Sequence, residues 1–515
     1  MNLLNLVVAL PAVGFVLLLF FPKDNHGAIR KASLAISLLI FVVSLGLTSG
    51  FSAPHTVFRF ETDTVWISSP EIRYHVGLDG VSVWLVLLST FLTPIGILVS
   101  WRHIDHHVKE FYAFLLLLEV GLVGVFAALD LFLFYVFWEV SLVPMYFLIG
   151  IWGHERRIYA AVKFFLFTMA GSVLMLAAII YLYLQAKTFD YVLILDKLNS
   201  GELALTSAQS FYLFLAFFIA FAIKVPLFPL HTWLPDAHVE APTAGSVMLA
   251  SVMLKMGTYG LLRFCLPMFP TASREAAPWV VFLAIVGIIY GALVAMVQPN
   301  MKKLVAYSSV SHLGFVVLGI FSFNQFGMDG AVYQMLNHGI STGALFMLVG
   351  YMYERRHSLE IAAYGGVSTP APNLAIVFMI TTLASVGLPM LNNFVGEFLV
   401  LQGAALVNFK WAICAALGVI LSAVYMLWLY QRAFFGPAPE EVQSHMYDLS
   451  PREWAAILPM IVMMVWLGTY TRPFLGAIGP ANAVIRWTVE SHLEYKVDRS
   501  SPAPLARVQE VPRAR

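Results

Sequence analysis

Residues 224–255 read KVPLFPLHTWLPDAHVEAPTAGSVMLASVMLK, a proline-broken and histidine-bearing connection with a lysine at each end. Apolar runs on both sides extend this stretch to residues 211–264 and predict two membrane helices, with Lys224 and Lys255 in mid-span. A lysine in hydrocarbon costs about 2.5–3.5 kcal/mol on insertion scales. Stability alone gives no reason to bear that cost in two neighbouring helices. We therefore expect both ammonium groups to belong to a proton-conducting device.

The composition is that of a membrane protein. Of the 515 residues, 60% are hydrophobic and only 11% are charged, whereas soluble domains have about 25% charged residues. The net charge of +1 and the lack of a basic patch indicate no nucleic-acid partner. Cys265 and Cys414 cannot ligate an iron–sulfur cluster, and no dinucleotide or Walker motif is found. The sequence thus predicts no cofactor in this chain. The energy for its activity would come from an ion gradient or from a partner subunit.

Repeated apolar runs predict an all-α polytopic membrane protein with about fourteen transmembrane helices. Short loops after the odd-numbered spans hold most of the Lys and Arg, so the positive-inside rule directs both termini outward. The N-terminal run lacks a cleavage site and is expected to be retained as the first span. The predicted spans are 3–21, 32–49, 80–100, 112–129, 131–152, 163–184, 211–230, 244–266, 278–297, 304–322, 331–352, 372–407 (with a break), 411–434 and 454–471.

Two spans share an interruption by proline next to an ionisable residue. In span seven the break follows Lys224, and in span twelve Gly387-Leu-Pro389 precedes Glu397. Such paired breaks are typical of inverted-repeat transporters, with the site at the broken helices. We expect one membrane domain over residues 1–472, with residues 112–266 and 278–434 as the inverted repeats.

Two segments lie outside this pattern. Residues 51–79 alternate polar and apolar side chains, which predicts an outer loop with a short hairpin. Residues 473–515 are expected to form a C-terminal surface segment that ends in a disordered, Pro- and Arg-rich tail.

Six ionisable residues are expected inside six different spans, and two histidines lie at the inner end of the broken helix. Burial raises the pKa of a carboxyl group and lowers that of an ammonium group, so both approach neutrality, where histidine already titrates. This set suits a proton relay. The relay residues are Glu139, Lys224, Lys255, His312, His338 and Glu397, and the predicted proton entry is at His231 and His238.

Structural alternatives exist for each group. An intramembrane Glu or Lys can pin helix packing, although polar contacts between helices usually come from Ser, Thr or Asn. His312 and His338 can be satisfied core histidines, and His231 and His238 can cap the turn. A metal site formed with Asp236 and Glu240 matches no familiar ligand spacing. Lys302 and Lys303 are interpreted as topology determinants, and residues 154–157 as a solvated loop.

Four motifs resemble the antiporter-like proton-pumping subunits of respiratory complex I. Glutamate at position 397 resembles the M-type subunits, because the related large, N-type and cation-antiporter subunits tend to carry lysine there. The similarity covers nearly all the predicted spans. The motifs are Phe137-Trp-Glu139-Val-Ser-Leu-Val-Pro144, Pro229-Leu-His231-Thr-Trp-Leu-Pro235-Asp-Ala-His238, Ala241-Pro-Thr-Ala-Gly245-Ser and Lys255-Met-Gly-Thr-Tyr-Gly-Leu-Leu-Arg263-Phe.

The resemblance implies roles for the same residues. Glu139 and Lys224 would form a controlling ion pair, and Lys255 would be the central relay. His312 and His338 would continue the path to Glu397, which would release protons outward. It also implies a bacterial inner-membrane location and an NADH:quinone oxidoreductase whose FMN, iron–sulfur clusters and quinone site lie in other subunits, next to neighbouring antiporter-like subunits. A sodium/proton antiporter, a membrane-bound hydrogenase arm and a structural scaffold remain the alternatives.

Overall fold

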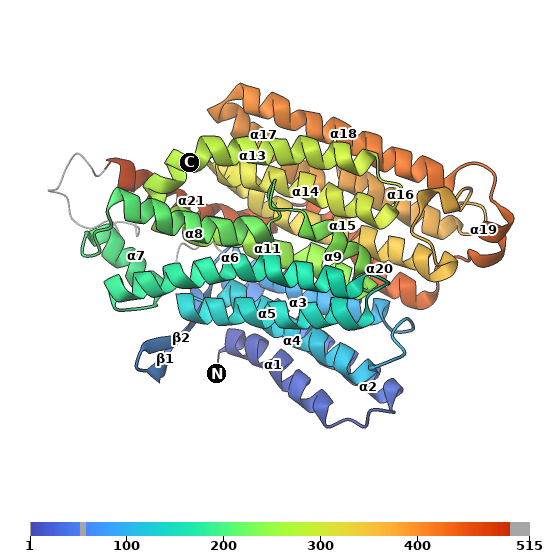
Figure 1. Cartoon of the computed structure of the whole chain (residues 1–515), viewed down its shortest axis with the longest axis horizontal. Coiled ribbons are helices and arrows are strands. Elements are labelled where there is room, and N and C mark those ends of the chain that lie inside the picture. Colours follow the sequence, from blue (N-terminus) through green and yellow to red (C-terminus); the bar gives the residue numbers. More distant parts are fainter. Residues whose placement is uncertain (1, 52–57, 495–515) are drawn as a thin grey trace.

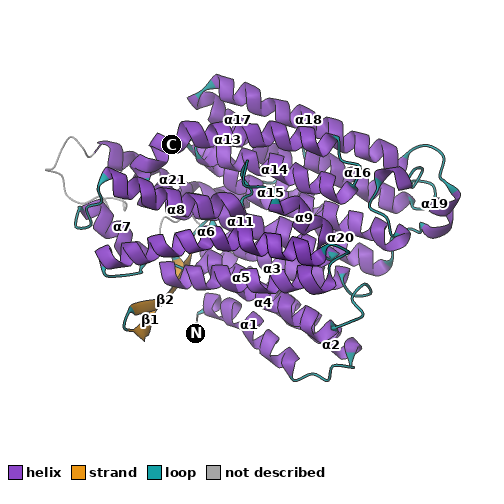
Figure 2. Cartoon of the chain, in the orientation of Figure 1, coloured by secondary structure: helices purple, strands orange, loops and turns teal. Residues whose placement is uncertain are grey.

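The computed structural model describes residues 2–51 and 58–494 and is a bundle of helices that run roughly parallel or antiparallel, with one β-hairpin at its edge (Figures 1 and 2). The hairpin consists of β1 (Arg59–Ser68) and β2 (Glu71–Leu78) in antiparallel pairing, with register shifts in β1 after Arg59 and Val65. The first half of the helices comprises α1 (Leu3–Leu19), α2 (His26–Leu45), α3 (Ser82–Val99), α4 (Val108–Ala127), α5 (Leu131–Trp152), α6 (Arg157–Ala186), α7 (Tyr191–Ser200), α8 (Ser207–Lys224), α9 (Trp233–Glu240), α10 (Thr243–Met248), α11 (Leu254–Gly260) and α12 (Leu266–Met268). The second half comprises α13 (Pro270–Met296), α14 (Met301–Ile320), α15 (Gln325–Arg356), α16 (Pro372–Val386), α17 (Asn392–Val407), α18 (Phe409–Phe434), α19 (Glu440–His445), α20 (Pro451–Thr469) and α21 (Arg472–Glu494).

The predicted spans correspond to helices of the structure. In the described part of the chain, eleven segments are long and apolar enough to cross a membrane, and α1 and α16 are shorter apolar helices. The long helix α15 is not among the eleven, because polar side chains such as Gln334, Asn337 and His338 interrupt its middle. The span expected at 372–407 is divided into α16 and α17, with the break where it was predicted.

The first broken helix ends at Lys224, because Pro226 and Pro229 have no backbone N–H with which to continue it. Residues 225–232 then cross to α9 without regular structure. The freed carbonyl of Ile223 accepts a hydrogen bond from the indole Nε1 of Trp233 at 2.9 Å. Satisfying that carbonyl inside the protein removes a cost of several kcal/mol that an unpaired group would carry in the membrane.

The second broken helix ends at Val386, where Gly387 takes a left-handed conformation with φ +82°. Glycine adopts this geometry without a Cβ clash and terminates helices for that reason. Pro389 follows two residues later, and α17 begins at Asn392. The break thus leaves Glu397 in the second turn of α17, buried near the middle of the bundle.

Lys255 lies between two π-helical segments, Leu249–Met253 and Leu261–Cys265, which flank α11. Such wide turns occur frequently at functional sites. A Cβ atom added to Gly257 would lie 2.7 Å from the backbone oxygen of Phe221, so glycine is needed for this close approach of α11 to α8. The two lysine-bearing helices are therefore packed directly together.

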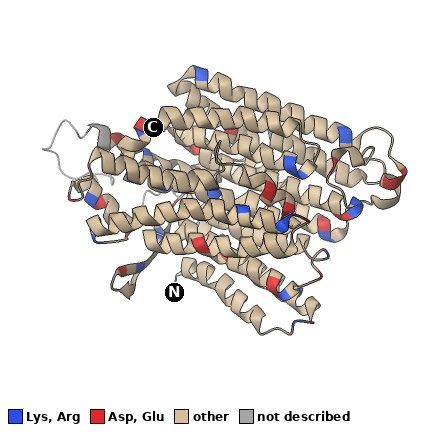
Figure 3. Ribbon diagram, viewed as in Figure 1, with Lys and Arg blue, Asp and Glu red and all other residues tan. Residues whose placement is uncertain are grey.

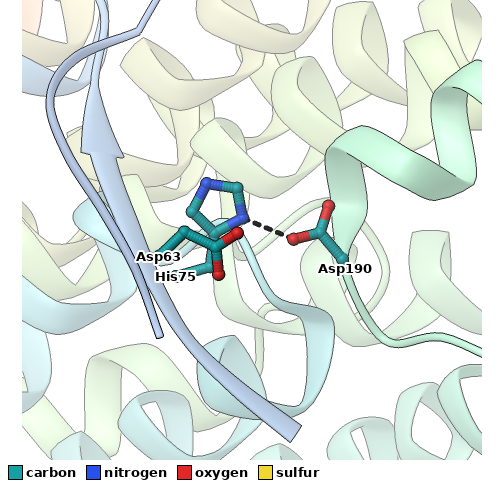
Figure 4. Close-up of side chains that lie close together, drawn as sticks. All are labelled: Asp63, His75 and Asp190. Carbon is teal, nitrogen blue, oxygen red and sulfur yellow. Dashed lines mark hydrogen bonds and ion pairs between the residues drawn. The ribbon is translucent and has the colours of Figure 1, made fainter. Parts of the chain in front are cut away.

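The hairpin is fastened to the bundle by a hydrogen bond between His75 and Asp190 (Figure 4). His75 on β2 is buried, with Nδ1 2.5 Å from Asp190 Oδ2 and Nε2 2.8 Å from Glu61 Oε1. Asp190 also caps α7 by accepting from the N–H of Leu193. Asp63, His75 and Asp190 could converge on a metal ion, since their ligand atoms lie within 4.8 Å of one another. Both His75 nitrogens already contact carboxylates and Arg73 holds Asp63, so we interpret the cluster as an ion-pair latch.

Burial alone would lower the pKa of His75, but the hydrogen bonds and charges of Asp190 and Glu61 raise it to about 9. A raised folded-state pKa means that the stabilisation is complete below the unfolded value of about 6.5 and disappears as the pH rises through about 9. This shift in pKa contributes on the order of 3 kcal/mol to the free energy of unfolding at low pH.

We therefore predict that His75→Gln increases amide hydrogen exchange in residues 71–78 at pH 6.5 and has little further effect at pH 10. The control is His106→Gln, at an exposed histidine, which should not change hydrogen exchange in residues 71–78 at either pH. The measurement is hydrogen–deuterium exchange, with variant and wild type compared at each pH. An equal difference between His75→Gln and wild type at both pH values would contradict the latch.

The C-terminal segment begins as the helix α21, which packs against α12, α13 and α15. The apolar start expected for residues 473–515 is thus part of a helix that lies along the bundle (Figure 1). The tail predicted to be disordered from Arg499 lies outside the described residues.

Candidate functional site

Charged side chains are concentrated at the two ends of the bundle and are sparse along its middle (Figure 3). The predicted relay residues are among those in the interior. Five of the six, Lys224, Lys255, His312, His338 and Glu397, are at most 3% exposed, and Glu139 is half-buried. The structure therefore buries five of the predicted relay residues, on α8, α11, α14, α15 and α17, and leaves Glu139 half-buried on α5.

Four of these residues form a continuous row. The ammonium Nζ of Lys255 lies 2.7 Å from His338 Nδ1 and donates to the carbonyl of Ala250 at 2.5 Å. The rings of His338 and His312 are 6.0 Å apart. His312 Nδ1 then lies 2.7 Å from Glu397 Oε1. The row links an ammonium group to a carboxylate through two imidazoles, which is a suitable chemistry for proton transfer.

Unpartnered ring nitrogens remain along the row. Within the residues that the structure describes, neither His338 Nε2 nor His312 Nε2 has a hydrogen-bond partner. A neutral imidazole carries a proton on one nitrogen and accepts on the other, so each ring can take a proton on one side and release it on the other. The two unpartnered nitrogens therefore leave room for transfer between the rings.

Polar side chains of α15 hold the second break in place. Gln334 Nε2 donates to Glu397 Oε1 at 3.0 Å, and Asn337 and Asn392 each donate to the other's backbone carbonyl, at 2.8 and 2.9 Å. Ser341 adds a hydrogen bond to Asn393. These contacts join the start of α17 to α15 and fix Glu397 against His312.

Lys224 and Glu139 do not touch. Lys224 makes no ion pair in the described structure, and its Nζ lies 5.4 Å from the ring centre of Trp138 and 5.3 Å from that of Phe164. Their charges still interact, since Glu139 acts electrostatically on the lysine. The ion pair implied by the family resemblance is therefore not a direct contact in the described structure, and its controlling role remains a prediction.

The two predicted entry histidines are both buried but differ in their surroundings. His231 stacks near Phe228, with ring centres 5.6 Å apart. His238 is fully buried and stacks on Phe346 at 4.3 Å, and neither of its nitrogens has a hydrogen-bond partner among the described residues. Within the same part of the chain, the turn from His231 to Glu240 does not bring its ligand atoms together as a metal site would.

Several polar residues of the interior were missed by the sequence reasoning. Glu119 on α4 is fully buried, and neither carboxylate oxygen has a partner in the described structure. It interrupts an apolar run, which is the signal that could have revealed it. Gln334 and Asn337 were also missed, because an uncharged amide inside a span is not unusual in sequence.

Two loops make contacts with the end of α9 that were not predicted. Lys302 was interpreted as a topology determinant, and the structure shows in addition that its side chain is buried and donates to the carbonyls of Ala241 at 2.6 Å and Val239 at 3.3 Å. In the loop 154–157, residues 155–157 are exposed, as expected for a solvated loop, but the loop also hydrogen-bonds to α9. There the backbone N–H groups of His154 and Arg156 donate to the backbone oxygen and the carboxylate of Glu240.

Comparison with known proteins gives the family. A family model described as "NADH:quinone oxidoreductase/Mrp antiporter, TM" matches residues 128–424. The chain is 48% identical over 493 residues to NADH-quinone oxidoreductase subunit M of Rhodobacter capsulatus, covering 94% of this chain and 96% of that protein. The chain belongs to the NADH-quinone oxidoreductase subunit M family. Its plant relative, NADH-ubiquinone oxidoreductase chain 4 of Arabidopsis thaliana, is 42% identical over 92% of this chain and 94% of its own.

Solved structures agree with membership of the subunit M family. A chain in respiratory complex I from Thermus thermophilus with bound NADH superimposes with a TM-score of 0.85 at 34% identity, covering 94% of this chain and 99% of that one. A chain of the membrane-bound sulfane sulfur reductase, an archaeal respiratory membrane complex, has a TM-score of 0.82 at 20% identity over 91% of this chain and 76% of its own. The second similarity shows a shared fold.

The reciprocal bonds of Asn337 and Asn392 generate a prediction for this subunit M family member. Asn337→Leu and Asn392→Leu should each remove one of the two bonds between α15 and α17, at a cost of about 0.5–1.5 kcal/mol. The costs should be non-additive in the double variant, because both bonds bridge the same two helices. Thermal unfolding of the wild type, the two single variants and the double variant measures these costs. Strictly additive effects would argue against the paired hydrogen bonds of Asn337 and Asn392.

Proposed function

We propose that this chain is a proton-translocating subunit in the membrane arm of an NADH:quinone oxidoreductase, located in a bacterial inner membrane. The observation that carries the proposal is the row from Lys255 through His338 and His312 to Glu397, in which neighbouring groups lie at hydrogen-bond or ring-contact distance. Family membership supports the same assignment. Neighbouring antiporter-like subunits and the lipid bilayer are the expected partners.

The row suggests the order of transfer. Lys255 gives a proton to Nδ1 of a neutral His338, which releases its other proton from Nε2. That proton reaches Nε2 of His312, directly or through one water molecule, and His312 delivers its Nδ1 proton to the carboxylate of Glu397. Lys255 loses one proton and Glu397 gains one, while each histidine still carries one proton but on its other nitrogen. The row returns to its starting state when Lys255 is reloaded, Glu397 discharges and both imidazoles return to their first tautomer.

Lys224 and Glu139 supply electrostatic control in this proposal. Two unit charges several Å apart interact by roughly 2 kcal/mol at an effective dielectric constant of about 20. Moving one charge against 100 mV costs about 2.3 kcal/mol. A change in the separation of Lys224 from Glu139 is thus large enough to bias the protonation of the nearby relay.

The chemistry that drives the pump belongs to other subunits in this proposal. NADH, FMN, iron–sulfur clusters and quinone would be handled elsewhere in the assembly, and their reactions would reach this chain as changes in charge or conformation. The alternative of a sodium/proton antiporter subunit has less support, because the relatives with 42–48% identity described above carry oxidoreductase names.

The first test is Lys255→Met in the assembled oxidoreductase. Methionine keeps the apolar stem but has no proton to give, so we predict a loss of coupled proton pumping of about a hundredfold or more, the low end of the range for a lost acid–base group. Proton uptake by sealed membranes during NADH oxidation is the measurement. The exposed Lys410→Met is the control and should behave as wild type. Wild-type pumping by assembled Lys255→Met enzyme would exclude the relay.

The second test removes the charge pair. Glu139→Ala and Lys224→Ala should each abolish pumping and strongly lower coupled turnover, while the complex still assembles, because each leaves one charge of the controlling pair alone. The measurement is proton pumping together with subunit content of the purified enzyme. Near-normal pumping by assembled Glu139→Ala enzyme would refute the controlling role.

A further inference from the structure

A second cluster of buried charge lies at the inner end of α9, separate from the relay row. Its centre is Lys302 on α14, which is 2% exposed although it lies next to the more accessible Lys303. Its ammonium group donates to the carbonyls of Val239 and Ala241 at the C-terminal end of α9. Glu240, between those two residues, interacts electrostatically with the same ammonium group.

A small cavity leads to this cluster from the surface. It has a volume of about 130 Å³, enough for several water molecules, and exposed residues such as Arg156 and Tyr159 form its mouth. Its wall includes Asp236, which pairs with Lys163 at 2.6 Å. Glu240 lines the same cavity and is 9% exposed, with Oε2 bound to the N–H of Arg156. A carboxylate thus meets water on one side and a buried ammonium group on the other.

His238 connects the cluster to the relay. Its fully buried ring has no hydrogen-bond partner in the described chain and interacts electrostatically with both Lys302 and Lys255. It also acts on His338, the second member of the relay row. The groups that face Lys302 are therefore Glu240 and His238 on α9, with His103 and His154 from the neighbouring loops.

We propose that Lys302 is the residue that admits protons to the relay, taking them from Glu240 at the cavity and passing them to His238. This inference rests on the proposed proton-translocating function and adds the entrance to it. An N–H bond of the Lys302 ammonium group breaks and the proton joins an imidazole nitrogen of His238. The neutral amine then takes the proton of a protonated Glu240, whose carboxylate is reprotonated from water in the cavity.

A purely structural role for Lys302 makes a different prediction. Cations near a helix C-terminus bind its last carbonyl groups, and Lys302 caps α9 in this way. Arginine would keep that capping, because it is a permanent cation with several donors, but it cannot release a proton under physiological conditions. Lys302→Arg therefore separates capping from proton transfer.

The experiment compares Lys302→Arg, Lys302→Met and the control Lys410→Met in the complete oxidoreductase, with sealed-membrane proton pumping, NADH oxidation and subunit content measured together. We expect both Lys302 variants to lose pumping by about a hundredfold or more. Lys410→Met should pump as wild type, because Lys410 is exposed and does not line the cavity. Pumping restored by Lys302→Arg, or normal pumping by Lys302→Met, would overturn the inference.

Glu240→Gln tests the same proton entry if the Lys302 variants fail to assemble. Glutamine preserves an acceptor for the N–H of Arg156 but cannot carry the proton, so pumping should fall while assembly is kept. Normal pumping by Glu240→Gln would overturn the inference. If only the proposed entrance is wrong, Glu240→Gln pumps normally while Lys255→Met does not. If the proposed proton-translocating function is wrong, Lys255→Met also pumps normally.

Discussion

The structure depends on the cost of placing ionisable groups in a low-dielectric interior. An unpaired charge there is so unfavourable that it must be neutralised, hydrogen-bonded or paired. Lys255 meets this condition through the carbonyl of Ala250 and the imidazole of His338, and Glu397 through His312 and Gln334. The residues that make burial tolerable are the same ones between which a proton can move.

The helix breaks serve this requirement. Each one frees backbone carbonyls, and a side chain beyond the break binds one of them. Trp233 donates to the carbonyl of Ile223 at the first break, and Asn393 donates to the carbonyl of Ser385 at the second. Because α15 packs against α14, α16 and α17, one helix aligns His338 with His312 and supports Glu397. The relay is therefore held by the same contacts that hold the fold together.

Much of this arrangement could be predicted from the sequence, because hydrocarbon imposes simple rules. Apolar runs gave the spans, prolines gave both breaks, and lone ionisable residues such as Lys255 and Glu397 identified the interior row. Contact geometry could not be predicted in this way. The position of the Lys224 ammonium group beside the rings of Trp138 and Phe164 depends on side-chain packing, and the burial of Lys302 depends on where the end of α9 lies. A basic residue in a loop and a basic residue under a helix end look alike in sequence.

The central claim is that Glu397 gains and loses a proton as the enzyme turns over. Infrared difference spectroscopy of the assembled oxidoreductase during NADH-driven turnover measures this directly through the C=O stretch of a protonated carboxyl group. Our account predicts a carboxyl band that shifts in D₂O and is absent from Glu397→Gln enzyme. An unchanged set of carboxyl bands in that variant would contradict it.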